Sequence, residues 1–226
     1  MVVGAPWRDN GGAVYVFTQQ GETWTEDIIL TSSDMTLGDW FGWSVAISGD
    51  TLLVGAPEKD GWRGSAYVFF LAEDGSWDEG TRLIPRNGTF SGYEFGQLVS
   101  LSGDSALIGA RGESVAYIFH RMNGVWQEEA HLEPYVEASV YSGAIFDWAI
   151  SGDTAMIGSP YYDDMDYTSP DDDVCGSRSG SVYVFIRQDD GTCEEVQKLT
   201  PADRKAKEYF GSRVAISGDT ALIWAE

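Results

Sequence analysis

The sequence predicts an all-β fold built of repeated four-stranded units, and three recurring segments carry that prediction. A strand-turn-strand stretch over residues 41–57, FGWSVAISGDTLLVGAP, recurs along the chain. A segment of small, aromatic and β-branched residues follows each copy, and a third segment that begins with Trp or Cys comes next. Four antiparallel strands repeated about every 50 residues are typical of the blades of a β-propeller.

The first two strands of each unit are joined by a tight turn. Val45 and Ile47 alternate with smaller or polar residues and predict strand A over 41–48, while the apolar run in 51–57 predicts strand B. Between them lies a Ser-Gly-Asp turn, whose aspartate recurs at Asp50, Asp104, Asp153 and Asp219. We expect each aspartate to hydrogen-bond its own backbone rather than to bind a metal ion.

Strands C and D form two further columns of matching residues. Strand C is predicted over 65–71, SAYVFFL, and strand D over 77–83 after a Gly-containing hairpin turn. The D column begins with Trp24, Trp77, Trp126 and Cys193, and a glutamate follows two residues later at Glu26, Glu79, Glu128 and Glu195. A residue that recurs at one register in every blade is expected to pack between neighbouring blades.

The motifs FG at 41–42, SVAISGDTLLVGAP at 44–57 and GSAYVF at 64–69 resemble the FG-GAP repeat of integrin alpha-subunit propellers. The resemblance covers the whole chain and implies blades of a propeller that usually has seven. We therefore expect a single β-propeller region over 1–226 that is a fragment of a larger ring. Its predicted parts are a partial blade 1–40, complete blades 41–94, 95–143 and 144–209, and a partial blade 210–226.

A four-bladed ring closed by the C-terminal strands is the alternative, although strand B would then be present twice. Two positions depart from the repeat, because Ala144-Ile145 replaces Phe-Gly and Trp224 replaces the Gly of the last GAP. In a fragment, both ends would expose apolar blade faces and strand edges. We therefore expect contact with remaining blades or self-association.

The charge and the hydropathy of the chain exclude several classes of partner. Fourteen Lys and Arg face 36 Asp and Glu, which gives a net charge of -22 and argues against nucleic acid and anionic membrane surfaces. The sequence contains no apolar run of the ~20 residues that a membrane helix needs, so we expect no membrane insertion.

Two cysteines, Cys175 and Cys193, are predicted to lie on opposite rims, too far apart for a disulfide.

One rim of the predicted propeller should carry recognition. In a four-stranded meander the A to B and C to D turns share one rim, and the B to C and D to A connections share the other. The B to C connections vary in length, and variable loops on a rigid scaffold are where binding usually occurs. Trp40 belongs to this rim, and the candidate ligand-binding residues on it are Trp7, Trp62, Tyr161, Tyr162 and Tyr167.

The longest of these loops, 161–180, is strongly acidic, and calcium is the one cofactor that it suggests. Calcium takes six to eight oxygen ligands, which such a loop could supply in part, although acidic loops are more often simply solvated. The candidate metal ligands are Asp163, Asp164, Asp166, Asp171, Asp172 and Asp173. The calcium loop of integrin-like repeats lies between strands A and B and is reduced here to Ser-Gly-Asp.

Asn87 begins an N-glycosylation sequon, Asn-Gly-Thr.

The sequence predicts binding rather than catalysis. Neither a G-x-S-x-G elbow nor an HExxH helix nor a phosphate-binding glycine loop is present, so we do not expect an enzyme. The resemblance implies an extracellular or cell-surface adhesion module that binds protein or glycan. A non-catalytic propeller region of a multidomain secreted hydrolase is the alternative, and an architectural spacer is a third.

Overall fold

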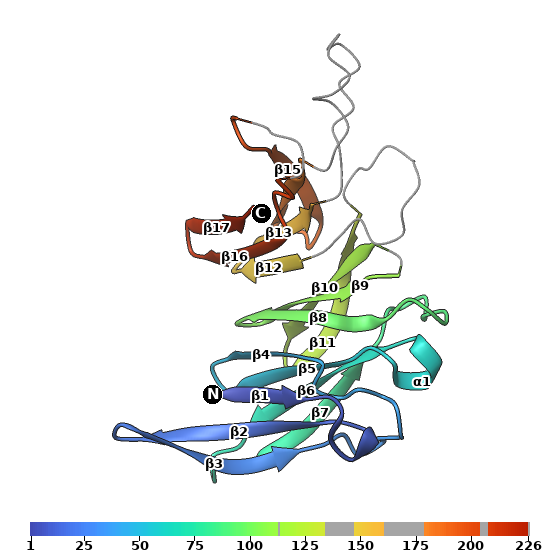
Figure 1. Ribbon diagram of the computed structural model, residues 1–226, viewed down its shortest axis with the longest axis vertical. Coiled ribbons are helices and arrows are strands. Elements are labelled where there is room, and N and C mark those ends of the chain that lie inside the picture. Colours follow the sequence, from blue (N-terminus) through green and yellow to red (C-terminus); the bar gives the residue numbers. More distant parts are fainter. Residues whose placement is uncertain (113, 134–146, 161–178, 204–207, 226) are drawn as a thin grey trace.

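The computed structural model describes residues 1–112, 114–133, 147–160, 179–203 and 208–225, and almost all of its regular structure is antiparallel β-sheet (Figure 1). Five sheets follow one another in chain order, and we call them blades I to V. Blade I contains β1 (Val2–Ala5), β2 (Ala13–Gln20) and β3 (Thr23–Leu30). Blade II contains β4 (Ser44–Ser48), β5 (Thr51–Ala56), β6 (Ser65–Leu71) and β7 (Trp77–Leu83). Blade III contains β8 (Phe95–Ser102), β9 (Ser105–Ala110), β10 (Val115–Met122) and β11 (Val125–Leu132). Blade IV contains β12 (Asp147–Ser151), β13 (Thr154–Ser159), β14 (Ser181–Arg187) and β15 (Cys193–Leu199). Blade V contains β16 (Arg213–Ser217) and β17 (Thr220–Trp224).

Within every sheet the strands are neighbours in the order in which they occur in the chain. The complete sheets therefore have the predicted A-B-C-D order, and the prediction of an all-β fold made of four-stranded propeller blades is confirmed. The predicted blade borders at residues 40, 94 and 209 fall in connections between sheets, and residue 143 lies outside the described part. Two short helical turns, η1 (Arg8–Asn10) and α1 (Lys59–Trp62), interrupt the B to C connections.

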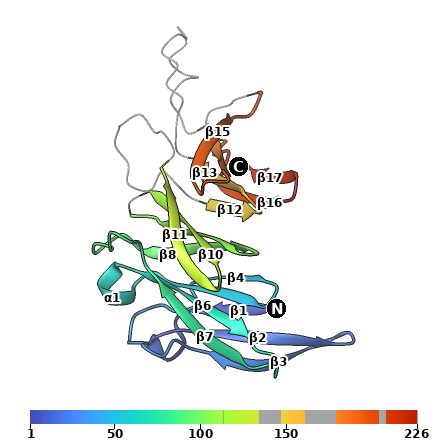
Figure 2. The same ribbon diagram turned by 180° about the vertical axis from the view of Figure 1, so that it is seen from behind.

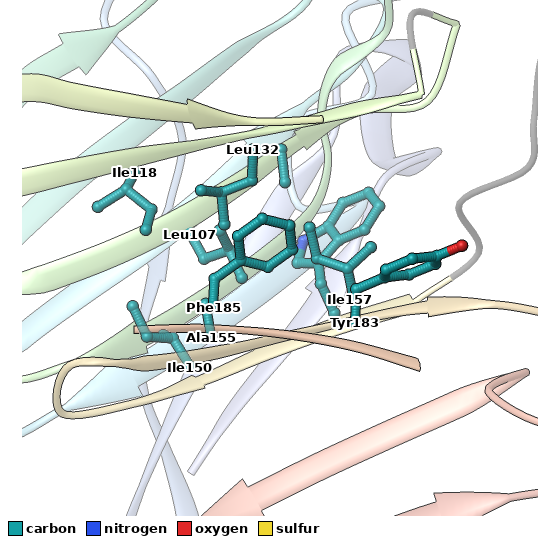
Figure 3. Packing of buried hydrophobic residues seen from close by; sticks show 10 residues of the cluster. Leu107, Ile118, Leu132, Ile150, Ala155, Ile157, Tyr183 and Phe185 are labelled. Carbon is teal, nitrogen blue, oxygen red and sulfur yellow. The ribbon is translucent and has the colours of Figure 1, made fainter. Parts of the chain in front are cut away.

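The blades are stacked face to face along the long axis of the molecule, as both views show (Figures 1 and 2). Strand B of each inner blade is covered on both faces by the neighbouring blades, which explains why its residues are apolar without alternation. All six residues of β5 and all six of β9 are buried. A cluster of apolar side chains fills each seam, and between blades III and IV Phe185 points toward Leu107 and Leu132 (Figure 3).

The glycines of the repeat allow the blades to approach closely. A Cβ atom on Gly55, the Gly of one GAP, would lie 1.9 Å from the carbonyl oxygen of Gly96, the Gly of the next FG. Gly158 has the same relation to Gly211, at 2.0 Å. Any side chain at the GAP glycine would thus force the next blade away, so glycine there is a requirement of packing.

The Ser-Gly-Asp turns connect each blade to the next through hydrogen bonds. The Ser102 hydroxyl accepts the backbone N–H of Gly152 at 2.9 Å. The same bond joins Ser48 to Gly103 and Ser151 to Gly218, at 3.0 Å in both cases. Asp104 differs from the prediction, because its carboxylate pairs with Arg121 on strand C at 2.6 Å, whereas Asp50 accepts from the hydroxyl of its neighbour Thr51 at 3.1 Å.

The column that begins with Trp has the predicted packing role, with one exception. Trp126 is 6% exposed and lies in the seam between blades II and III, and Trp77 packs partly into the seam between blades I and II. Trp24, at the same register in blade I, is 47% exposed, so the packing role is confirmed at Trp77 and Trp126 alone. The glutamate two residues after the tryptophan connects blades, because Glu79 accepts the N–H of Ser33, in the connection that follows β3, at 2.7 Å.

Candidate functional site

Four of the nine tryptophans lie together on the rim that carries the B to C and D to A connections. Trp7 precedes η1 in blade I, Trp40 and Trp43 flank the Phe41-Gly42 motif before β4, and Trp62 ends α1 in blade II. They come from three connections and cross the boundary between two blades. We call them the tryptophan row.

The indole rings of the row contact one another in the order Trp7, Trp43, Trp40, Trp62. Trp7 meets Trp43 edge to face with ring centroids 6.2 Å apart, and Trp43 stacks on Trp40 at 5.0 Å with 16° between the planes. Trp62 is tilted by 55° to Trp40 at 6.1 Å. Trp7 is 70% exposed and Trp62 48%, so the row presents a large aromatic surface to solvent.

The backbone holds these indoles in place. Trp40 and Trp62 both have left-handed φ angles, 57° and 67°, a conformation that costs a non-glycine residue roughly 1 kcal/mol. Glu94, which also precedes an FG motif, has a φ of 54°, so the backbone at this position belongs to the repeat and only the indole is particular to blade II. The carbonyl of Trp62 is fixed by the N–H groups of Gly92 and Glu94, at 2.8 and 3.2 Å.

A buried ion pair lies among the connections that carry Trp40 and Trp62. The Lys59 ammonium is 2.9 Å from the Asp39 carboxylate, and their side chains are only 3% and 5% exposed. Lys59 also donates to the backbone carbonyl of Asp34, and Thr36 donates to Asp39 through its N–H and its hydroxyl at 2.6 and 2.8 Å. Since Lys59 belongs to α1 and Asp39 to the connection before β4, the pair joins the two connections.

Asp34 extends this network to the surface. It accepts a hydrogen bond of 2.7 Å from Tyr67 and one of 3.0 Å from Arg82, which also binds Asp60. Burial raises the pKa of Asp34, but the Tyr67 hydroxyl and the charges of Lys59 and Arg82 outweigh it, so its pKa lies below the ordinary value. Burial raises the pKa of the Tyr67 phenol above its usual range. At neutral pH the network therefore contains an ionised carboxylate and a neutral phenol.

This geometry suits adsorption of a ligand. The rings offer apolar faces, and charged residues lie near them in the sequence, with Arg8 and Asp9 after Trp7 and Asp60 two residues before Trp62. Across the described ranges, His, Cys, Asp and Glu nowhere gather in a group of three that could hold a metal ion.

Cys193 is a free, half-buried thiol. Burial raises the pKa of this thiol to about 11, so it is inert at neutral pH. Cys175 lies outside the described residues.

The structure brings together some of the predicted ligand residues. Trp7 and Trp62 lie in one row with Trp40, whereas Trp43 was missed because strand A of blade II reads as a regular copy. The sequence signal that could have identified Trp43 is its residue type, since the corresponding positions in blades III and V hold Gln97 and Ser212. Asn87 is exposed in the turn after β7. The predicted tyrosines and metal ligands lie outside the described residues: Tyr161, Tyr162, Tyr167, Asp163, Asp164, Asp166, Asp171, Asp172 and Asp173.

Comparison with known proteins identifies the repeat and the fold. Residues 24–69 and 193–225 match the family model described as the FG-GAP repeat. Among solved structures, a Bacteroides uniformis protein provisionally named as a 6-phosphogluconolactonase is similar with a TM-score of 0.63 and 12% identity, over 100% of this chain and 60% of that one. A Lactobacillus plantarum protein is similar with a TM-score of 0.51 and 15% identity, over 87% of this chain and 52% of that one.

The chain thus spans between half and three fifths of the length of these two structures, and at such identities the similarity shows the fold alone. A search of the curated proteins finds no match to the sequence. Within the part of the chain that the structure describes, no helix is long and apolar enough to cross a membrane.

Proposed function

Because the chain is an FG-GAP repeat protein whose blades build a β-propeller region, we propose that it is a binding module whose tryptophan row is the ligand surface. It acts outside the cell or at the cell surface, in adhesion to a protein or a glycan. FG-GAP repeats occur in adhesion proteins and extracellular proteins, which supports this location.

The observation that carries the proposal is the convergence of four tryptophans from positions that do not correspond to one another in the repeat. Trp7 corresponds to Glu58 in blade II, and Trp62 corresponds to Asn10 in blade I. A structural role common to all blades would repeat the indole at the same position in each, as Trp77 and Trp126 do in their seams. Exposed tryptophans gathered in one place are instead typical of binding surfaces, where Trp is enriched among the residues that contribute most energy.

The stacked blades make the row effective by holding it rigid. The left-handed backbone at Trp40 and Trp62 and the buried pair of Lys59 and Asp39 fix the connections before any ligand arrives. Binding energy is then not spent on ordering the loops. The acidic loop 161–180 remains a second proposed contact on this rim, with calcium as its proposed metal.

An enzymatic function is less well supported. One structural neighbour is named provisionally for a lactonase, but 12% identity carries the fold and not the chemistry. The FG-GAP repeat fold is generally non-catalytic. We propose that this region does not catalyse a reaction, whether it acts alone or as the propeller region of a secreted hydrolase.

The experiment is a binding screen of the purified chain against immobilised glycans and extracellular-matrix proteins. We expect at least one partner to bind, and we expect the double variant Trp7→Ala/Trp62→Ala to lose it. Trp24→Ala is the matched control, because Trp24 is 47% exposed but begins β3 at the opposite rim. Binding that survives the double variant, or that is lost equally in the control, would contradict the proposed surface.

A further inference from the structure

We propose that the ligand of the tryptophan row is a neutral glycan chain several sugar rings long, which docks lengthwise along the four indoles. This inference rests on the proposed function and specifies its ligand class.

The faces that the row exposes are suited to sugar rings. A hexopyranose has an apolar face of C–H groups and a polar edge of hydroxyls, and an indole offers a flat apolar face of similar size. Stacking one on the other removes apolar area from water and leaves the hydroxyls solvated. Trp7 and Trp62, the two ends of the row, are its most exposed members and provide the largest free faces.

The elongated shape of the row favours a chain over a compact ligand. Each indole contacts the next at 5.0 to 6.2 Å, and the row runs from a connection of blade I to a connection of blade II. A cage for a methylated ammonium group needs rings that surround a single point. Here Trp40 and Trp43 stack nearly parallel, at 16°, and leave no room between them for such a group. Since Trp40 and Trp43 cover each other's facing sides, a ligand that contacts the exposed faces of both Trp7 and Trp62 must be long enough to span the row.

The polar groups that border the row match the edge of a sugar. Arg8 and Asp9, which follow Trp7 in the sequence, are paired at 3.3 Å, and Arg82 binds Asp60, two residues before Trp62. Guanidinium groups donate and carboxylates accept, so each end of the row can satisfy hydroxyls of both kinds. A protein partner that buried the row would have to desolvate these charges, whereas hydroxyls can bind them while remaining wet.

The net charge of the chain decides which glycans fit. At -22, the protein repels sulfated and uronic acid chains. The proposed ligand is therefore neutral, and heparin oligosaccharides serve as the negative probe.

The test is calorimetric titration of the whole chain with cello-, manno- and chito-oligosaccharides of two to six units, and with a heparin hexasaccharide. We expect at least one neutral series to bind, with an affinity that rises with length until the row is covered. Trp7→Ala and Trp62→Ala should each weaken the hexasaccharide by at least about tenfold. The Trp24→Ala control should bind like the wild type, and circular dichroism and thermal melting of each variant verify folding.

Several results would overturn the inference. They are the absence of binding by every neutral series at millimolar concentration, an affinity independent of length, equal binding by the Trp7→Ala and Trp62→Ala variants, or tighter binding of heparin. If the row variants lose a protein partner from the screen while no saccharide binds, the binding module stands and its glycan ligand falls. If neither a protein nor a glycan binds, both fall.

Discussion

The two rims of the molecule are connected by the same strands but use their residues in opposite ways. On the rim of short turns, the same serine, glycine and aspartate occur in blade after blade, and the serine and glycine make the same bond to the next blade. On the other rim the connections differ in each blade, and four tryptophans meet there from positions that hold other residues in the neighbouring blades.

The comparison separates residues that build the propeller from residues that use it. A repeated tryptophan, such as Trp126, is buried in a seam, and an unrepeated one, such as Trp7, is 70% exposed. Trp148 departs from this division, since no other blade has a tryptophan at its position and it is still only 5% exposed in the seam between blades III and IV. The guide to function in this fold is therefore departure from the repeat combined with exposure.

The largest expected effect comes from removing one tryptophan of each kind. Trp126→Ala should lower the free energy of unfolding by about 3–5 kcal/mol, because it leaves a cavity in the seam between blades II and III. Trp7→Ala should change it by less than about 0.5 kcal/mol. Urea denaturation measures both. Similar losses in the two variants would show that the row also stabilises the fold and would break the comparison.

The second effect concerns two glycines of blade II. Gly55→Ala should destabilise by about 3 kcal/mol, since its Cβ would lie 1.9 Å from the Gly96 oxygen and the next blade must shift. Gly49→Ala is the matched control: its φ is 60° but nothing lies within 4 Å of an added Cβ, so it should lose only about 1 kcal/mol. Thermal unfolding of both variants distinguishes them. Equal effects would mean that backbone conformation, and not the contact between blades, requires the glycine.

The third effect is a dependence on pH in the seam between blades III and IV. Arg187 donates to the Glu129 carboxylate through Nε at 2.7 Å and through Nη2 at 2.9 Å. These bonds hold the pKa of that carboxyl below its ordinary value, against the opposing effect of burial. A lowered pKa in the folded state stabilises the protein above the unfolded pKa of about 4.3. That stability is lost as the pH falls through the folded value.

Glu129→Gln should therefore destabilise by about 1.5 kcal/mol at pH 7, and the difference from wild type should shrink below about pH 4. Denaturant titrations across this range measure it. A difference that stays constant with pH would show that the amide loses packing rather than charge.

The smallest effect tests the bonds that join the turns. Ser102→Ala removes the acceptor of the Gly152 N–H and should lower the free energy of unfolding by about 0.5–1 kcal/mol, because the site is partly solvated. Ser76→Ala, in the hairpin of blade II, loses only a local bond to Asp74 and is the control. Hydrogen exchange at Gly152 should accelerate in the first variant alone. Unchanged exchange would mean that the serine does not protect this amide.

The sequence was sufficient for the blades because each strand and turn is repeated, and repetition shows which residues share one role. It predicted the strand order, the rim of variable connections, and Trp7 and Trp62 as exposed candidates. It did not reveal that these indoles touch, since that depends on how the connections of two blades bend toward each other. The pair of Lys59 and Asp39 was also invisible, because two charges twenty residues apart in an acidic chain give no sign of burial.

The hydrogen bonds between the turns also have a direction. Each serine accepts from the glycine of the blade that follows it in the chain, and the GAP glycines Gly4, Gly55 and Gly158 each face the carbonyl of the FG that follows. A blade therefore has a leading and a trailing face that are complementary but not interchangeable. A duplicated blade would fit after its parent without any new contact, so this architecture can lengthen by copying one unit while its rim connections are free to diverge.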